Sequence, residues 1–371
     1  MFNEADSSSR LAHLDGMRCV AVMGVVLYHY LVRWAAPIAQ VSLYPFGDRF
    51  SNLPFVKHGS LGVELFFIIS GFVIALTLTR CRNIAEFAVR RYARLAPPML
   101  FFSALTFAVL TIVPGAPFPT SPRWFFSSIT FIDPSDAMRI VRSANLDSID
   151  GVYWSLYVEV KFYAIAAALY FWRKRHFHWW LCAFALLSEA SRHSGVPSLV
   201  SVADLLLIPQ EIPWFLLGVS LFQRYRGDAT RSYLPGMILA VALLPLVKVP
   251  GHPPPAELAE AVVVFVFWLG MSNSVVQRLL SARFMTAIGA ASYSLYLFHQ
   301  YVGVTLLRAA GSYGESTIGG LVLVGVVTVV VTLVALAGHR ILEVPSNRLI
   351  VGLWRRYRSA ANAIGSSPTS A

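Results

Sequence analysis

A histidine and an arginine stand eleven residues apart in an apolar stretch near the N-terminus. If this stretch is helical, Arg18 and His29 lie on one face, roughly 16 Å apart. Histidine is the side chain best suited to accept a proton near neutral pH, so His29 is a candidate general base. The alternative is that Arg18 anchors the helix at a membrane surface and His29 packs against neighbouring helices.

A second set of polar residues interrupts the apolar segment 152–172. Glu159 and Tyr163 are four residues apart and share a helix face, whereas Lys161 points elsewhere. A buried carboxylate can orient a histidine base or offset its charge, and a tyrosine can donate a hydrogen bond to a developing oxyanion. The alternative is that these groups pair only to hold a helix bundle together.

Three arginines gather just before another apolar segment, at Arg90, Arg91 and Arg94. Spacings of three and four residues put their side chains together on a helix surface. Guanidinium groups bind phosphate oxygens in pairs, so this cluster is a candidate site for a phosphorylated co-substrate. The alternative is attraction to anionic lipid headgroups.

Other polar residues in apolar stretches are candidates either for an acceptor site or for structure. Glu64 is a second candidate to orient His29, or an interfacial carboxylate without a special role. Ser70 suits close helix packing. Tyr293 and His299 belong to a polar stretch that either lines an acceptor cavity or makes hydrogen bonds between helices.

The elements that must position these residues are membrane-spanning helices. Of the 371 residues 56% are hydrophobic and 13% are charged, against about 25% charged in an average soluble domain. A spanning helix needs roughly 20 mostly apolar residues. The sequence therefore predicts an all-α integral membrane protein, a bundle of about ten transmembrane helices. The candidate spans are 17–35, 60–79, 95–113, 152–172, 177–191, 201–222, 233–250, 257–276, 285–307 and 317–341.

The net charge of +11 reflects topology rather than nucleic-acid binding. Basic residues cluster in every second loop of the ten-span arrangement, and the positive-inside rule then places these loops and both termini in the cytoplasm. The expected partner is a lipid bilayer, with no nucleic acid. The clusters are Arg80, Arg82, Arg90, Arg91 and Arg94; Arg173, Lys174 and Arg175; Arg224, Arg226 and Arg231; Arg278 and Arg283; and Arg355, Arg356 and Arg358.

One membrane domain, residues 13–345, is expected after a cytoplasmic segment, residues 1–12. The sequence Glu343-Val344-Pro345 is typical of a helix end. We expect the cytoplasmic tail, 346–371, to be disordered, because it becomes rich in Ser and Ala. The cysteines show no metal-ligand spacing, and we expect neither a metal site nor a tightly bound cofactor.

Taken together, these residues resemble the membrane-bound acyltransferase 3 family, which includes bacterial O-acetyltransferases of surface polysaccharides. The resemblance extends from near residue 11 to about 345. One departure is Glu64, where the family usually has Asp. The blocks that carry the resemblance are Leu14-Asp15-Gly16-Met17-Arg18 with His29; Gly62 to Phe72; Arg90-Arg91-Tyr92-Ala93-Arg94-Leu95; Trp154-Ser155-Leu156 with Glu159 and Tyr163; and Ser292-Tyr293-Ser294-Leu295-Tyr296-Leu297-Phe298-His299.

The resemblance implies a ten-helix acyltransferase that uses acyl-CoA, here acetyl-CoA, as a donor co-substrate from the cytoplasm. It also implies that the Arg18–His29 pair and the arginine cluster matter for activity. The expected acceptor is a hydroxyl of an exported polysaccharide or its lipid-linked precursor, a carbohydrate or glycolipid, at a bacterial inner membrane. Polysaccharide-synthesis machinery is then a candidate partner. The alternative acceptor is a small lipophilic molecule such as a macrolide.

In the expected mechanism His29 takes the proton of the acceptor hydroxyl as that oxygen attacks the thioester. Glu159 or Glu64 orients His29, and Tyr163 donates a hydrogen bond to the oxyanion. A covalent acyl-histidine intermediate is the alternative route. Two other classes remain open. A transporter or flippase would usually show repeated halves with broken helices, which the sequence lacks. A receptor or structural protein would not need the Arg18–His29 face.

Overall fold

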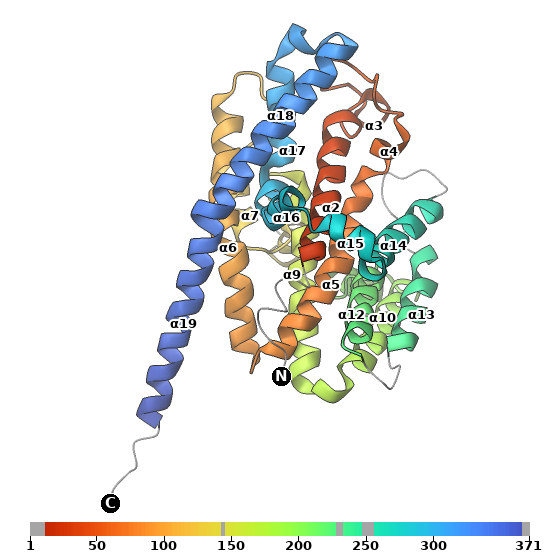
Figure 1. Cartoon of the computed structure of the whole chain (residues 1–371), viewed down its shortest axis with the longest axis vertical. Helices are drawn as coiled ribbons and strands as arrows, with labels where there is room; N and C mark the ends of the chain where they lie inside the picture. Colours follow the sequence, from red (N-terminus) through yellow and green to blue (C-terminus); the bar gives the residue numbers. More distant parts are fainter. Residues whose placement is uncertain (1–11, 142–144, 228–232, 247–255, 366–371) are drawn as a thin grey trace, which may run out of the picture.

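The computed structural model describes residues 12–141, 145–227, 233–246 and 256–365, and within these ranges every regular element is a helix (Figure 1). The longer helices are α2 (Ala12–Leu31), α5 (Gly62–Arg80), α6 (Ile84–Ile112), α9 (Trp154–Trp172), α10 (Phe177–Arg192), α11 (Pro197–Leu206), α12 (Ile212–Tyr225), α13 (Tyr233–Leu243), α14 (Ala256–Ser272), α17 (Ser292–Ala309), α18 (Thr317–Gly338) and α19 (Val344–Gly365). The shorter ones are α3 (Ala36–Ala39), α4 (Pro54–Lys57), α7 (Pro122–Ile129), α8 (Pro134–Val141), α15 (Ser274–Leu280) and α16 (Arg283–Ala290).

Helix α2 lies at the centre of the bundle and packs on α5, α16 and α17 (Figure 1). Glycines let the neighbouring helices approach closely. A Cβ atom at Gly71 of α5 would lie 2.2 Å from the carbonyl oxygen of Phe215, and one at Gly218 of α12 would lie 2.0 Å from that of Ile68. The α5–α12 contact therefore depends on small residues, as in other helix pairs buried in membranes.

Among the described residues, five helices are long and apolar enough to cross a membrane, or six if the bent pair α14–α15 counts as one span. They are Ala12–Leu31, Gly59–Arg80, Ile84–Ile112, Gly151–Trp172 and Thr317–Ala360, and the bent pair turns by 96°. The expectation of an all-α fold with helices able to span a membrane is confirmed for the described residues, but the count of about ten spans is not. The segment 201–222, predicted as one span, is divided between α11 and α12 around Pro209, because proline lacks an amide donor and disfavours helix in the residue before it.

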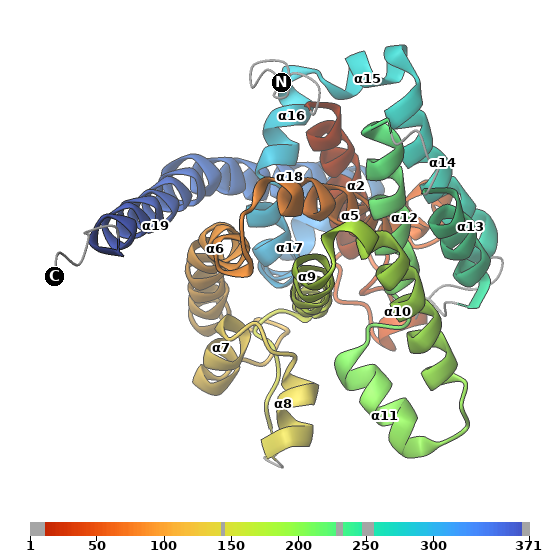
Figure 2. The ribbon, with the colours of Figure 1, turned by 90° about the horizontal axis from the view of Figure 1, so that it is seen from below.

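The C-terminal region differs from the prediction. A π-helical turn, His339–Glu343, joins α18 directly to α19, so the helix passes through Pro345 and continues to Gly365. The tail expected to be disordered is therefore helical as far as residue 365, and the predicted helix end at Pro345 is wrong. The outermost predicted segments, 1–11 and 366–371, lie outside the described residues. Figure 2 shows α19 leaving the bundle on the side away from α13 and α14.

The π-helical turn explains how Pro345 is accommodated. Wider i→i+5 hydrogen bonding locally replaces the α-helical pattern that a proline interrupts. Glu343, in this turn, is buried and accepts a hydrogen bond from Ser294 of α17 at 2.9 Å. It also lies 3.0 Å from Nδ1 of His339. These contacts fix the point from which α19 leaves the bundle.

Candidate active site

An inner cavity of about 70 Å³ lies among α2, α5, α6, α9 and α17 and collects most of the predicted site residues. The predicted residues that line it are Arg18, Ser70, Arg91, Arg94, Glu159, Tyr163 and Tyr293. They come from five helices far apart in the sequence. The cavity therefore places three guanidinium groups around one carboxylate in an otherwise apolar setting, where charges interact strongly because water is scarce.

The polar groups of the inner cavity are held by neighbours on the same or adjacent helices. Ser70 donates a hydrogen bond to Glu159 at 2.5 Å. Arg18 forms an ion pair with Asp15 at 2.9 Å, one turn earlier on α2. Arg91 donates to the hydroxyl of Thr77 at 2.6 Å, while its buried Nε has no hydrogen-bond partner among the described residues. This Nε–H is a donor that an incoming anion could use.

Arg91 also stands over two aromatic rings, with its guanidinium carbon 5.5 Å from the ring centre of Tyr163 and 5.6 Å from that of Phe87. These cation–π contacts tie the guanidinium to Tyr163 of α9 and to Phe87 of its own helix without neutralising it. Arg91 thus keeps a full charge at the boundary between the inner cavity and the arginine-rich surface described below.

His29 faces a different cavity and is paired with a second histidine. Its Nδ1 lies 2.8 Å from the carbonyl oxygen of Val25 and 3.3 Å from Nε2 of His299. Nδ1 of His299 lies 2.9 Å from the carbonyl oxygen of Tyr296. Because a carbonyl only accepts, the hydrogen-bond network assigns the proton of each neutral ring to Nδ1. His29 then keeps the lone pair of Nε2 free, as a general base requires.

The outer cavity, which His29 lines, is larger, with a volume of about 570 Å³. Its walls combine aromatic rings with amide and carboxyl groups. The aromatic residues are Tyr28, Trp34, Phe67, Trp154, Trp214, Tyr296 and Tyr301, and the polar ones include Arg33, Glu64, Gln210, Glu211 and Gln300. Oε2 of Glu64 is buried and has no hydrogen-bond partner among the described residues. This composition suits a bulky ligand with both apolar faces and hydroxyl groups.

Asp150 supports the wall of the outer cavity from behind. Its carboxylate is fully buried and accepts hydrogen bonds from the backbone amides of Val152 at 3.2 Å and Tyr301 at 3.0 Å. The link joins the start of the α9 segment to α17, next to the cavity residue Gly151. Burial raises the pKa of Asp150 to about 7, although the two amide donors oppose the shift.

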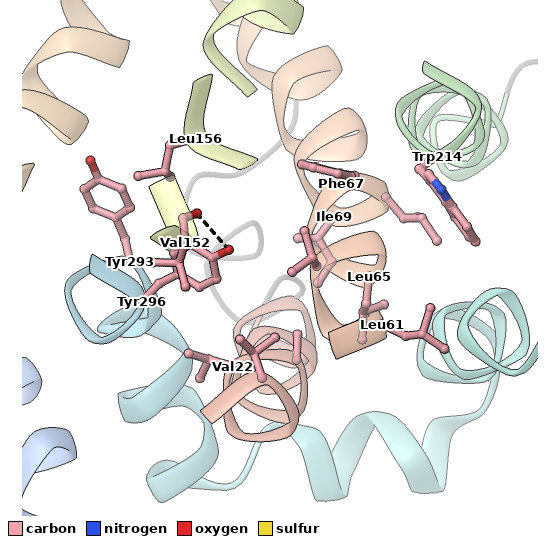
Figure 3. Packing of buried hydrophobic residues seen from close by; sticks show 14 of the residues in the cluster. Val22, Leu61, Leu65, Phe67, Ile69, Val152, Leu156, Trp214, Tyr293 and Tyr296 are labelled. Carbon is pink, nitrogen blue, oxygen red and sulfur yellow. Dashed lines mark hydrogen bonds between the residues drawn. The ribbon is translucent and has the colours of Figure 1, made fainter. Parts of the chain in front are cut away.

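Three residues line both cavities and form the partition between them: Val63, Phe67 and Tyr296. The hydroxyl of Tyr296 bonds to that of Ser155 at 2.8 Å and donates to the carbonyl oxygen of Val152 at 3.2 Å, the bond drawn in Figure 3. These bonds tie α17 to the start of α9. The partition is therefore thin, apolar on the α5 side and hydrogen-bonded on the α17 side.

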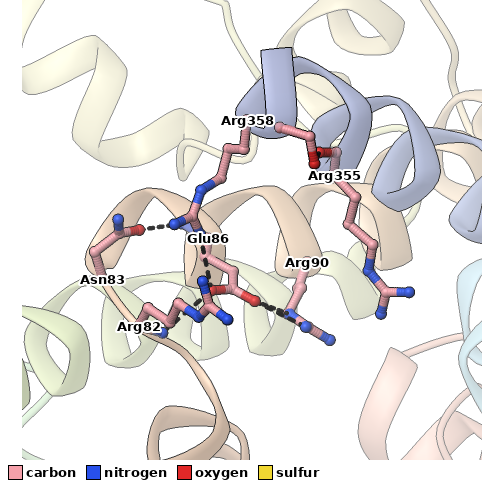
Figure 4. A network of polar contacts seen from close by, with 7 residues as sticks. Arg82, Asn83, Glu86, Arg90, Arg355 and Arg358 are labelled. Atoms are coloured by element: carbon pink, nitrogen blue, oxygen red, sulfur yellow. Dashed lines mark hydrogen bonds and ion pairs between the residues drawn. The ribbon is translucent and has the colours of Figure 1, made fainter. Parts of the chain in front are cut away.

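A third cavity, the arginine pocket, opens beyond the inner cavity and has a volume of about 550 Å³. Six arginines line it, with Thr77, Asn347, Val351 and Gly352: Arg80, Arg90, Arg91, Arg94, Arg348 and Arg355. Arg91 and Arg94 line the inner cavity as well. No carboxylate is among the described lining residues. Figure 4 shows Glu86 beside the pocket, paired with Arg90 at 2.8 Å and with Arg358 of α19 at 3.4 Å.

The structure brings some of the predicted residues together and separates others. Arg18 and His29 share α2, but Arg18 lines the inner cavity and His29 the outer one. Glu159 bonds to Ser70, and the partner found for His29 is His299 rather than a carboxylate. Lys161 lies apart from both cavities, in an ion pair with Asp136 of α8 at 2.6 Å.

Sequence reasoning missed several residues that these cavities use. Asp150 precedes a glycine at the start of α9, a pattern typical of a helix cap, and could have been found from it. Nothing in the sequence indicates that Trp34 and Trp214 line a cavity rather than face lipid. The sequence places Arg348 and Arg355 in a tail expected to be disordered, and therefore gives no indication of their place in the arginine pocket.

A family model matches most of the chain. The model of the acyltransferase 3 family, described as an acyltransferase domain, matches residues 11–337. "O-acetyltransferase OatA" of Staphylococcus aureus (strain NCTC 8325 / PS 47) is 32% identical over 108 residues, 27% of this chain and 14% of that protein. "Putative peptidoglycan O-acetyltransferase YrhL" of Bacillus subtilis (strain 168) is 26% identical over 184 residues, 44% of this chain and 24% of that protein. This chain thus spans less than a quarter of the length of these relatives. No solved structure matches the chain.

Proposed function

Because the chain belongs to the acyltransferase 3 family, and its relatives are named as O-acetyltransferases, we propose that it is a membrane-embedded O-acyltransferase. The proposed donor is acetyl-CoA, and the proposed acceptor is a hydroxyl of an exported polysaccharide or its lipid-linked precursor. We place the chain in a bacterial inner membrane as a bundle of about ten helices, with both termini cytoplasmic, in line with the distribution of its basic residues.

The observation that carries this proposal is the sequence of three cavities through the bundle. The arginine pocket and the inner cavity share Arg91 and Arg94, and the inner and outer cavities share the partition at Tyr296. One end of this path is cationic and the other end is aromatic and polar. A phosphorylated donor and a hydroxyl-bearing acceptor could therefore approach the partition from opposite sides.

On the donor side, the phosphates of acetyl-CoA fit the arginine pocket by charge. Guanidinium groups bind phosphate oxygens with two parallel hydrogen bonds, and the described residues that line the pocket include no carboxylate that would compete for them. The thioester arm, which is uncharged, would then extend past Arg91 into the inner cavity. In this arrangement the arm of the donor is surrounded by Arg18, Glu159 and Tyr163 in the inner cavity, and His29 lies on the acceptor side, in the outer cavity.

In the proposed reaction, Nε2 of His29 takes the proton from the acceptor hydroxyl while the hydroxyl oxygen attacks the thioester carbon. A carbon–oxygen bond forms, the carbon–sulfur bond breaks, and the proton on His29 passes to the leaving CoA sulfur. The Nδ1–H of the transient imidazolium stays directed at the carbonyl of Val25 and at His299, which stabilises the positive charge. General-base catalysis of this kind is worth about 10²–10⁴-fold in rate.

On the acceptor side, the walls of the outer cavity favour a sugar. Sugar rings present apolar C–H faces that stack on aromatic rings, and the cavity offers Trp34, Trp154 and Trp214 for this purpose. Hydroxyl groups at the ring edge would find the amide and carboxyl groups of Gln300 and Glu64.

The test uses purified protein in liposomes with radiolabelled acetyl-CoA and a crude surface-glycan extract. We expect wild-type protein to release CoA and label the glycan. His29→Ala should lower the rate of label transfer by at least about 100-fold. His176→Ala is the matched control, since His176 is exposed in the turn before α10. Equal label transfer by wild type and His29→Ala would reject the assigned base. No turnover of any acyl donor by wild type, with solute movement across the liposome membrane, would indicate a transporter instead.

A further inference from the structure

The C-terminal helix α19 lies beyond the region that the family model matches, which ends at residue 337. Two of its side chains, Arg348 and Arg355, nevertheless line the arginine pocket together with four arginines from α5 and α6. Arg348 and Arg355 are seven residues apart, or two helical turns, and so project from the same face of α19. Two of the six cations in this pocket therefore come from outside the matched domain.

Contacts at two levels hold α19 over the pocket. At its start, the buried Glu343 is bonded to Ser294 of α17 at 2.9 Å. Further along, Arg358 reaches the carboxylate of Glu86 on α6 at 3.4 Å, and the same carboxylate binds Arg90 (Figure 4). Arg355 lies between these anchors and faces the pocket, as Figure 4 shows beside Arg90. The helix is thus fixed to the bundle by polar contacts at both levels.

The charge of the pocket favours an anionic ligand. Six guanidinium groups line it, while the neighbouring Glu86 is already shared between Arg90 and Arg358. Like charges gathered in one cavity repel each other, which weakens the packing of α19 on α6 unless a counter-charge enters. A ligand with several phosphate groups supplies that charge and matches the fork geometry of arginine.

We propose that α19 is part of the donor site, and that Arg348 and Arg355 bind the phosphate groups at the nucleotide end of acyl-CoA. The inference rests on the proposed function and extends it to a segment outside the matched family domain. In this arrangement α5 and α6 supply the inner arginines, next to the thioester arm, and α19 supplies the outer ones. The anchors at Glu343 and Glu86 position α19, and Arg348 and Arg355 contact the ligand.

The test compares the double variant Arg348→Ala/Arg355→Ala with Arg340→Ala/Arg356→Ala. The control removes the same charge from the same continuous helix, at two exposed positions that do not line the pocket. Equilibrium binding of radiolabelled acetyl-CoA is measured on nanodiscs of phosphatidylcholine. We expect the first variant to weaken binding by about 10–100-fold, from the loss of charge-assisted hydrogen bonds, and the control to change it by less than about 3-fold.

A second ligand separates phosphate binding from a general effect on the fold. Acetyl-pantetheine carries the thioester arm without phosphate groups, so its affinity should be equal in the wild type and both variants. If the first variant loses acetyl-pantetheine and acetyl-CoA affinity in the same proportion, α19 only stabilises the bundle and the inference is wrong. If the variant binds acetyl-CoA as tightly as wild type, the inference fails while the proposed donor stands. If wild type itself does not bind acetyl-CoA, both fail.

Anionic lipid headgroups carry the same phosphate chemistry and are tested in a separate arm. The melting temperature of each protein is compared in phosphatidylcholine nanodiscs with and without phosphatidylglycerol. Stabilisation by phosphatidylglycerol that is present in wild type, absent from Arg348→Ala/Arg355→Ala and accompanied by unchanged acetyl-CoA affinity would assign the pocket to lipid and overturn the inference. We expect the melting temperatures of the two variants to respond equally to phosphatidylglycerol.

Discussion

The contact between His29 and His299 yields the sharpest prediction about catalysis. The ring of His299 is fully buried, and its Nε2 lies 3.3 Å from Nδ1 of His29. Since Nδ1 of His299 is directed at the carbonyl oxygen of Tyr296, Nε2 of His299 can only accept. His299 therefore stabilises the protonated form of His29 more than the neutral form, because a hydrogen bond from a charged donor is the stronger one.

The magnitude follows from this geometry. A hydrogen bond to a charged group contributes about 1.5–3 kcal/mol, and this one is long and shared with the carbonyl of Val25, so roughly 1–2 kcal/mol is expected. If this stabilisation is present in the transition state, His299→Ala should lower kcat/KM by about 5–30-fold. His29→Ala, which removes the base, should cost about 10²–10⁴-fold. The loss at His299 should thus be clearly smaller than the loss at His29.

The assay is steady-state transfer of radiolabelled acetyl groups from acetyl-CoA to the glycan acceptor, with the exposed His176→Ala as control. His299→Gln should recover part of the activity, since its amide oxygen can accept from Nδ1 of His29. A His299→Ala variant with wild-type kcat/KM would refute the role of this contact. The same conclusion would follow if alanine and glutamine at position 299 lowered activity equally while the protein stayed folded.

Three further predictions concern the bundle and its cavities. Gly71→Ala places a methyl group 2.2 Å from the carbonyl oxygen of Phe215, so we expect a loss of about 1–3 kcal/mol and a lower melting temperature, whereas Gly325→Ala, with open space around it, should change neither. Asp150 has a pKa of about 7 in the folded state and about 3.9 in the unfolded state. Between these pH values the folded state binds more protons than the unfolded state, so the free energy of unfolding falls as the pH rises. Asp150→Asn should remove this slope from melting temperatures measured between pH 4.5 and 7.5. Tyr296→Phe removes the hydrogen bonds that hold the partition in place, so we expect water to reach the thioester more readily and hydrolyse acetyl-CoA faster. The measurement is the rate at which free thiol appears in the absence of an acceptor.

Residue types and spacing indicate several of the side chains that line the inner cavity. Arg18 and Glu159 are charged groups in apolar helices, where a charge is costly and needs a reason. Tyr163 shares a helix face with Glu159. They line one cavity in the structure. Gly71 lies where α5 contacts α12, and a small residue at such a point lets two membrane helices approach closely.

The distribution of residues between cavities could not be predicted in this way. Helical periodicity places Arg18 and His29 on one face, but three turns of helix separate them, and other helices decide which cavity each one meets. The same periodicity does not reveal that His29 is paired with a histidine 270 positions away rather than with a carboxylate. Such pairs depend on long-range packing, to which a single sequence gives no access.

The C-terminal region shows a second limit. Pro345 normally predicts the end of a helix, and serine and alanine after Arg358 suggest disorder. The π-helical turn at His339–Glu343 overrides the proline locally, and the ion pair between Arg358 and Glu86 fixes the helix beyond it. Neither feature has a signature in the sequence alone, which is why two arginines of the pocket were missed.

The position of the partition also bears on the choice between an acyltransferase and a transporter. A transporter must let the whole substrate pass. Here the described residues that the two cavities share are Val63, Phe67 and Tyr296, and two hydrogen bonds hold the hydroxyl of Tyr296 in place. Only the acetyl group of the donor needs to reach this point, because the phosphates are attracted to arginines at one end and the base lies at the other. The acceptor likewise needs to present only one hydroxyl to His29. A thin partition between two unlike cavities therefore suits transfer of a small group, because the acetyl group and the acceptor hydroxyl meet there while the rest of each substrate stays on its own side.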